Sequence, residues 1–183
     1  MDIGVVSMRY ARALLQFAER NKDAETVYAE MQALARSYLA VPQLRPVLLN
    51  PTLPAAEKQQ LLVTASAGEK QLSVSLNRFF ELVISRQRVD CMQFIANSYL
   101  TLYQEKNNLT QGRLITACPV SADTVERMKS LVARLTQKDV RLETVQDPTI
   151  EGGFILEYGT YRMDACLKSR LAQIRRKLET VTC

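Results

Sequence analysis

The stretch EKNNLTQGRLITACPV, residues 105–120, marks the point at which the pattern of apolar residues changes. Before it, apolar side chains recur at the three- and four-residue spacing of amphipathic helices. After it, they form the alternating and continuous short runs that are typical of strands. The sequence therefore predicts a mainly α protein, with an N-terminal helical bundle over residues 1–106 and a small α/β domain over residues 107–183.

The N-terminal part is expected to fold as a bundle of six helices. Long helices are predicted at residues 5–20, 24–40, 70–86 and 90–106. Between the second and third of these, prolines favour short helices joined by sharp turns, because proline lacks the amide hydrogen that a helix interior requires. These prolines are Pro42, Pro46, Pro51 and Pro54, and the last is suited to the first turn of a helix that runs to Ala67.

Strands and two helices are predicted beyond residue 107. RLITACPV (113–120) is typical of a strand, and Ser121 is placed to cap the helix that follows it. DVRLETV (139–145) alternates like a half-buried strand. Past the turn at Asp147–Pro148, two further strands are expected to meet around Gly159. A final helix is then predicted, with one apolar stripe formed by Leu167, Leu171, Ile174 and Leu178.

Composition argues against several classes of function. The 183 residues include 24 Lys and Arg against 19 Asp and Glu, and this excess is not gathered into the basic stripe of a dedicated nucleic-acid-binding protein. Histidine, a frequent catalyst and metal ligand, is absent, and the four cysteines form no CxxC pair. No apolar run approaches the ~20 residues of a membrane span. We therefore expect a soluble protein of a reducing compartment, with no catalytic residues, no metal site and no cofactor.

The adjacent Gly152 and Gly153 invite comparison with a phosphate-binding loop. They match neither the P-loop nor the dinucleotide fingerprint, and they precede a strand, whereas a phosphate loop follows one and opens a helix. A structural role at a positive φ or a bulge is expected instead. Asp147 is expected to open the preceding turn, and Asp164 to cap the final helix, rather than to form a catalytic pair.

The final helix is predicted to carry a basic face. A solvated face is the default interpretation, binding of an acidic partner is the next, and binding of nucleic acid is the third. A basic helical nucleic-acid-binding protein is therefore kept as the alternative function. The face comprises Lys168, Arg170, Arg175, Arg176 and Lys177.

The first predicted helix is apolar or small over roughly 220° of its circumference, about twice the arc needed to pack on one side of a bundle. One interpretation is a central helix that is covered from several sides. The other is an arc that stays partly open to receive a partner's amphipathic helix. Leu82 favours a groove, because it stands off the apolar stripe of its own helix, beside Arg78 and Arg86.

One edge of this arc is predicted to form the groove. It consists of Val6, Tyr10, Ala13 and Phe17, and the opposite edge, with Ala11, Leu15 and Ala18, is expected to face the core. Ala13 is small, so a partner helix could approach closely there. Leu82 would form the other wall.

Three motifs give the chain a resemblance to a known family. They are RYARALLQFA at 9–18, FFELVISRQR at 79–88, and the Asp-Pro-x-x-x-Gly-Gly turn, hairpin, Asp and basic helix at 147–178. With them the sequence resembles the delta subunit of F-type ATP synthases, called the oligomycin-sensitivity-conferring protein in mitochondria, over essentially its whole length. Glu151 and Cys166 depart from the family pattern, which usually has an apolar residue and a serine there.

The resemblance implies a non-catalytic stator subunit that links the catalytic head to the peripheral stalk and resists torque during proton-driven ATP synthesis. The family binds N-terminal segments of alpha subunits with its first and fifth helices, which supports Val6, Tyr10, Ala13, Phe17 and Leu82 as contacts.

The C-terminal domain would be held by the peripheral-stalk b subunits, with Gly152, Gly153, Leu171 and Arg175 as candidate contacts. The resemblance further implies a monomer within the assembly that binds no nucleic acid. It would lie on the cytoplasmic side of the bacterial cell membrane and reach the membrane only through the complex.

Overall fold

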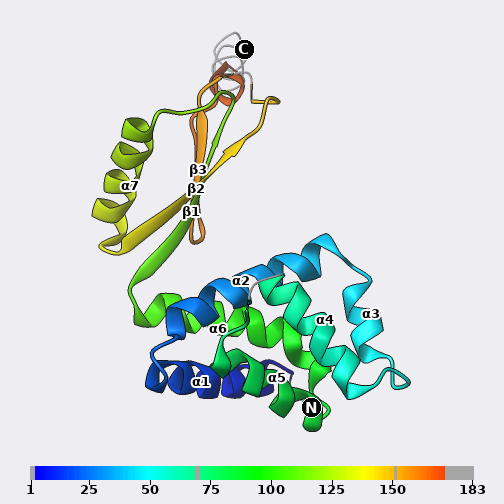
Figure 1. Cartoon of the computed structure of the whole chain (residues 1–183). Coiled ribbons are helices and arrows are strands. Elements are labelled where there is room, and N and C mark those ends of the chain that lie inside the picture. The colour runs from blue at the N-terminus through cyan, green and yellow to red at the C-terminus, as the bar shows by residue number, and fades with distance from the viewer. Residues whose placement is uncertain (1–2, 69–70, 151, 172–183) are drawn as a thin grey trace. The chain divides into compact units, whose positions relative to one another are not determined.

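The computed structural model describes residues 3–68, 71–150 and 152–171, and the chain divides into two compact units, Met1–Lys106 and Asn107–Cys183. Each unit contains its own secondary structure (Figure 1). Together they form a mainly helical chain with a small four-stranded sheet, which confirms the expected fold class at this level.

The first unit is helical throughout the part that is described. α1 packs against α6 and α5, and α2 packs against α6 and α4. The largest fully buried side chains come from α2, α5 and α6, so these helices supply the centre of the core. The elements are α1 (Ile3–Arg20), α2 (Ala24–Ala40), α3 (Leu44–Leu49), α4 (Ala55–Ala67), α5 (Val74–Ser85), the 3-10 helix η1 (Val89–Cys91) and α6 (Met92–Lys106).

α5 and α4 begin later than the sequence predicts. α5 begins at Val74 rather than at residue 70, because Ser73 is its N-cap and its side chain accepts a hydrogen bond from the Leu76 amide. Pro54 has extended backbone geometry and precedes α4, so it is the N-cap of that helix rather than part of its first turn. The start of α5 follows from the Ser73 cap, which fixes the last non-helical residue, whereas the start of α4 follows from the extended backbone of Pro54, which makes no side-chain cap.

Two acidic side chains of the α1–α2 region hold the N-terminus of α5. The buried Glu30 accepts hydrogen bonds from the amide and hydroxyl of Ser73, at 2.8 and 2.5 Å. Asp23 accepts from the hydroxyl of Ser75 at 2.9 Å. Burial raises the pKa of Glu30, because its charged form loses hydration. These contacts fix the position of α5, which borders the site described below.

In the described part of the second unit, α7 lies on one face of a four-stranded sheet (Figure 1). The strand order is β2-β1-β3-β4; β1 and β2 are parallel, and the other neighbours are antiparallel. Leu114 and Leu156 of the sheet pack against Val132 of α7. Ser121 caps α7 as predicted, accepting from the Thr124 amide. The elements are β1 (Leu109–Thr116), α7 (Ala122–Thr136), β2 (Asp139–Gln146), β3 (Phe154–Tyr158) and β4 (Tyr161–Asp164).

β1 begins earlier than the apolar pattern predicts, at Leu109 rather than residue 113. Its polar first half pairs with the start of β2, from Leu109 opposite Asp139 to Gly112 opposite Leu142. A Cβ at Gly112 would lie only 2.6 Å from a methyl carbon of Leu142 and 2.9 Å from the Glu157 carbonyl. Backbone pairing and close approach therefore place this segment in the sheet, ahead of the strand that the apolar pattern predicts.

Candidate helix-docking site on the first helix

α1 is buried along one side only. Ala11, Leu14, Leu15 and Ala18 lie in the core, whereas Val5, Arg9, Arg12 and Gln16 are exposed. The helix packs with this buried side toward α6, α5 and α2. It is therefore not the fully covered central helix that one interpretation of the sequence required.

The predicted edge residues lie along the border between the buried and exposed sides of α1. Val6, Tyr10 and Phe17 are half-buried, and Ala13 is exposed. Tyr10 packs edge-on against Phe79 of α5, with ring centroids 6.3 Å apart and planes at 71°. This contact places the edge beside α5 and gives it an aromatic floor.

Leu82 lies on the flank of α5 rather than in the core. The buried positions of the helix include Leu76, Phe79, Phe80 and Val83, whereas Leu82 remains 45% exposed. It follows Phe79 by three residues, so the two side chains project from neighbouring parts of one helix face. The structure thus places an exposed leucine next to the aromatic residue that contacts α1.

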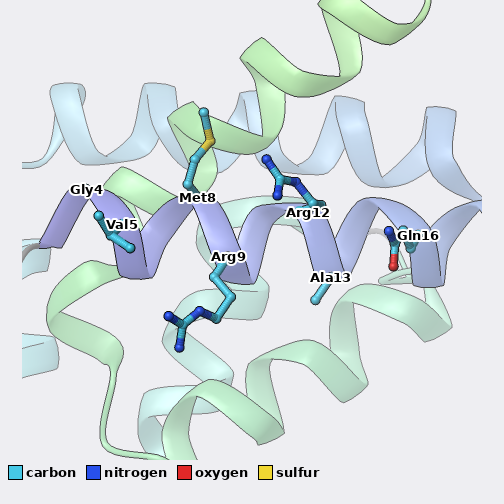
Figure 2. A pocket seen from close by; sticks show the side chains of 7 residues that line it. All are labelled: Gly4, Val5, Met8, Arg9, Arg12, Ala13 and Gln16. Carbon is cyan, nitrogen blue, oxygen red and sulfur yellow. The ribbon is translucent and has the colours of Figure 1, made fainter.

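An open hollow of about 630 Å³ runs along the outer side of α1. Figure 2 shows Arg9 and Ala13 projecting to one side of the helix and Met8 and Arg12 to the other. Among the predicted contacts, Ala13 lines this hollow. Its described lining residues are Gly4, Val5, Met8, Arg9, Arg12, Ala13 and Gln16.

Sequence reasoning did not assign Val5 and Met8 to the site, although both are exposed apolar residues on α1. The width of the apolar arc could have found Met8, which lies at the far edge of that arc, whereas Val5 falls in the polar sector between Arg12 and Gln16 and gives no such signal. The predicted edge used the side nearer α5. Val5 and Met8 are exposed on α1 outside that predicted edge.

The paired glycines allow a close approach of two backbone segments in the second unit. Gly153 has φ +89°, and a Cβ there would lie 2.3 Å from the Ala165 carbonyl oxygen. The Gly152 carbonyl accepts a hydrogen bond from the Leu167 amide at 3.0 Å. Both glycines therefore hold the turn against the start of the final helix, and neither is shaped to hold a phosphate.

Asp147 organises the turn before the glycines. Its carboxylate accepts hydrogen bonds from the amide and hydroxyl of Thr149, at 2.9 and 2.7 Å. These hydrogen bonds lower the pKa of Asp147. The carboxylate and the following Pro148 thus fix the local backbone.

Asp164 is not the N-cap of the final helix, which corrects the sequence prediction. The N-cap is Cys166, whose carbonyl accepts from the Arg170 amide at 3.1 Å. Asp164 ends β4 and accepts from the Cys166 amide at 2.9 Å and the Ser169 hydroxyl at 2.8 Å. Hydrogen bonds from Cys166 and Ser169 lower the pKa of Asp164 to about 2. The carboxylate stabilises the helix start from two residues upstream.

The remaining candidate contacts are Leu171 and Arg175. Residues 167–171 are helical, and Leu171 is 64% exposed. Arg175 and the rest of the predicted stripe and basic face lie outside the described residues. Over the described part of the chain, no cluster of three or more His, Cys, Asp or Glu side chains is arranged to hold a metal ion, and no helix is suited to crossing a membrane.

The fold leaves an exposed apolar edge on α1 and no cluster of metal ligands among the described residues, and sequence comparison gives the family. The family described as ATP synthase delta (OSCP) subunit matches residues 6–178, so the chain belongs to this family of non-catalytic ATP synthase subunits. Nothing in the comparisons supports the alternative of a nucleic-acid-binding protein.

Individual relatives are similar over nearly the full length. ATP synthase subunit delta of Phocaeicola vulgatus is 42% identical over 177 residues, covering 97% of this chain and 95% of the relative. The subunit of Bacteroides fragilis is 38% identical with the same coverage, and that of Lactobacillus acidophilus is 33% identical over 94% of each chain.

A solved structure shares the fold. A chain of the mitochondrial ATP synthase hexamer of Toxoplasma gondii superposes with a TM-score of 0.62 at 15% identity, covering 94% of this chain and 96% of that one. At this identity the likeness shows the arrangement of the backbone alone.

Proposed function

We propose that this chain is the stator subunit that joins the catalytic head of an F-type ATP synthase to its peripheral stalk. Family membership over residues 6–178 supports this role. A stator needs no reacting groups, but it must hold torque through non-covalent interfaces. Exposed apolar side chains beside well-packed cores suit such a function, because burial of apolar surface supplies most of the free energy of association.

The first unit is proposed to act as a six-helix bundle that binds N-terminal helical segments of alpha subunits. The observation that carries this proposal is the uncovered edge of α1 beside α5. There, Ala13 is exposed, Tyr10 and Phe79 form a floor, and Leu82 remains exposed on the neighbouring helix. An amphipathic helix laid along this edge would bury its apolar stripe against them.

The second unit is proposed to bind the far ends of the b subunits. The exposed Leu167 and Leu171 at the start of the final helix are apolar side chains available for such a contact. Gly152 and Gly153 would contribute by fixing the turn beside them. In this arrangement the chain acts as a monomer on the cytoplasmic side of the membrane and reaches the membrane only through the complex.

Copurification tests the proposal directly. An affinity-tagged full chain, isolated from its own cells after mild detergent extraction, is expected to retain both alpha and b subunits. The same chain with Ala13→Asp should lose alpha but keep b, because the substitution affects only the first unit. Retention of neither subunit by the unaltered chain would refute the proposal.

A further inference from the structure

Exposed arginines flank the apolar docking edge, which is formed by Val6, Tyr10, Ala13 and Phe17 of α1 and by Leu82 of α5. Arg9 precedes Ala13 by one turn on α1, and Arg78 and Arg86 precede and follow Leu82 by one turn at the other wall. Residues four apart share a helix face, so each arginine lies beside an apolar contact residue. These three residues, Arg9, Arg78 and Arg86, are called the basic rim.

The basic rim is not neutralised within the described part of the first unit. No ion pair joins any of the three arginines to another described residue. Two acidic side chains of the same helices make contacts elsewhere: Glu19 of α1 pairs with Lys106 at 2.6 Å, and Glu81 of α5 accepts a hydrogen bond from Gln59 of α4 at 3.4 Å. Residues 1–106 hold 12 basic against 10 acidic groups, so the unit as a whole is nearly balanced. The uncompensated charge is therefore a local property of this edge.

We propose that the docking edge selects an acidic amphipathic helix, one that carries carboxylates on both flanks of its apolar stripe. The inference rests on the proposed function and adds to it the charge pattern that the alpha segment must present. Guanidinium groups bind carboxylates by charge-assisted hydrogen bonds, and a basic partner would meet like charges on both walls. The apolar floor supplies affinity, and the basic rim determines which helix binds.

The basic rim also constrains the register of the bound helix. Arg78 and Arg86 are separated by eight residues, or about 12 Å along α5 at 1.5 Å per residue. A partner that lies along α5 therefore satisfies both arginines when its carboxylates on that flank are spaced by about two helical turns. Sliding the partner by half a turn would leave both arginines unpaired, so the apolar stripe is held in one position.

The preference of the docking edge for an acidic helix can be tested with one peptide and its neutral counterpart. The probe is a synthetic peptide of the alpha subunit's first 25 or so residues from the same cells, compared with a version in which every Asp and Glu is replaced by Asn and Gln. Binding to the full chain is measured by calorimetry at 0.05 and 0.5 M NaCl. The native peptide should bind at least tenfold more tightly than the neutral one at low salt. This advantage should shrink at high salt, because exposed charge pairs are screened.

Arginine variants localise the effect. Arg9→Gln, Arg78→Gln and Arg86→Gln should each weaken binding of the native peptide about two- to fivefold, as expected for one exposed ion pair. The neutral peptide should be unaffected by them. Arg36→Gln is the matched control, because Arg36 is an exposed arginine of α2 that lies outside both the docking edge and the hollow along α1, and it should leave binding unchanged.

The outcomes separate this inference from the proposed function. Equal binding of the native and neutral peptides, or an alpha segment without flanking carboxylates, would overturn the selection of an acidic helix while leaving the docking edge intact. Equal losses for Arg9→Gln and Arg36→Gln would also overturn it, since the effect would then be one of overall charge. Absence of binding by both peptides at low salt would instead refute the docking function itself.

Discussion

Placing a charge at Ala13 tests whether the open edge of α1 is a docking surface. Ala13 is exposed, so Ala13→Asp should leave the fold nearly intact, within about 0.5 kcal/mol of the unaltered chain. In a complex the new carboxylate would lie between α1 and the partner helix, away from water. An uncompensated buried charge of this kind costs about 3–5 kcal/mol.

That cost corresponds to a loss of affinity of about 140- to 3,700-fold, at 1.4 kcal/mol per factor of ten. Arg9, one turn earlier on α1, can offset part of it. An exposed pair at this spacing contributes only about 0.2–0.5 kcal/mol, however, so the net loss should still exceed about 50-fold.

Two measurements and a matched variant make the test decisive. Thermal unfolding followed by circular dichroism reports on the fold, and calorimetry with the alpha N-terminal peptide reports on binding. Ala18→Asp is the control, because Ala18 lies on the same helix but is fully buried, so this variant should unfold the first unit. Unfolding of the Ala13→Asp variant would show that Ala13 is part of the core. Unchanged binding by a folded variant would show that the partner docks elsewhere.

Three further predictions concern the units and their supports. A fragment that ends at Lys106 should fold as a helical bundle by circular dichroism and retain binding of the alpha peptide; an unfolded fragment would show that the first core depends on the second unit. Gly153→Ala should destabilise the second unit by at least about 1–3 kcal/mol, because the new Cβ would collide with the Ala165 carbonyl. Gly159→Ala should cost less, because Gly159 also has a positive φ but no atom lies within 4 Å of the new Cβ. Equal losses of stability in urea denaturation would refute the steric argument. The pKa of Glu30 is raised in the folded state, so its contribution to stability is present at low pH and is lost as the pH rises through the folded-state value. Relative to Glu30→Gln, the unaltered chain should therefore lose stability in urea titrations between pH 4 and pH 7, and a constant difference across that range would contradict this prediction.

Local pattern determined much of the secondary structure. The α2 boundaries, the cap of α7 by Ser121 and the hairpin around Gly159 follow from residues within a few positions of one another. Apolar periodicity and capping act over one or two helical turns, so they can be interpreted without knowing what packs against the element. The same pattern showed that α1 has more apolar surface than one packed side needs.

Contacts between residues distant in sequence decided the remaining boundaries of the helices and strands. The start of β1 depends on pairing with β2, thirty residues later, and the start of α5 is held by Glu30, forty-three residues earlier than Ser73. The position of Asp164 relative to the final helix depends on where β4 stops pairing with β3. Sequence periodicity carries no information on these partners, because each was brought close only by the folding of the whole unit.

The docking site shows the same division. The composition of α1 determined that an apolar edge would be left over, since a helix packed on one side cannot bury roughly 220° of its surface. Which edge remained open was decided by the packing of α5 and α6, which places Tyr10 against Phe79 and leaves Ala13 exposed. The physical reason is that amphipathicity is a property of one helix, whereas exposure is a property of its neighbours.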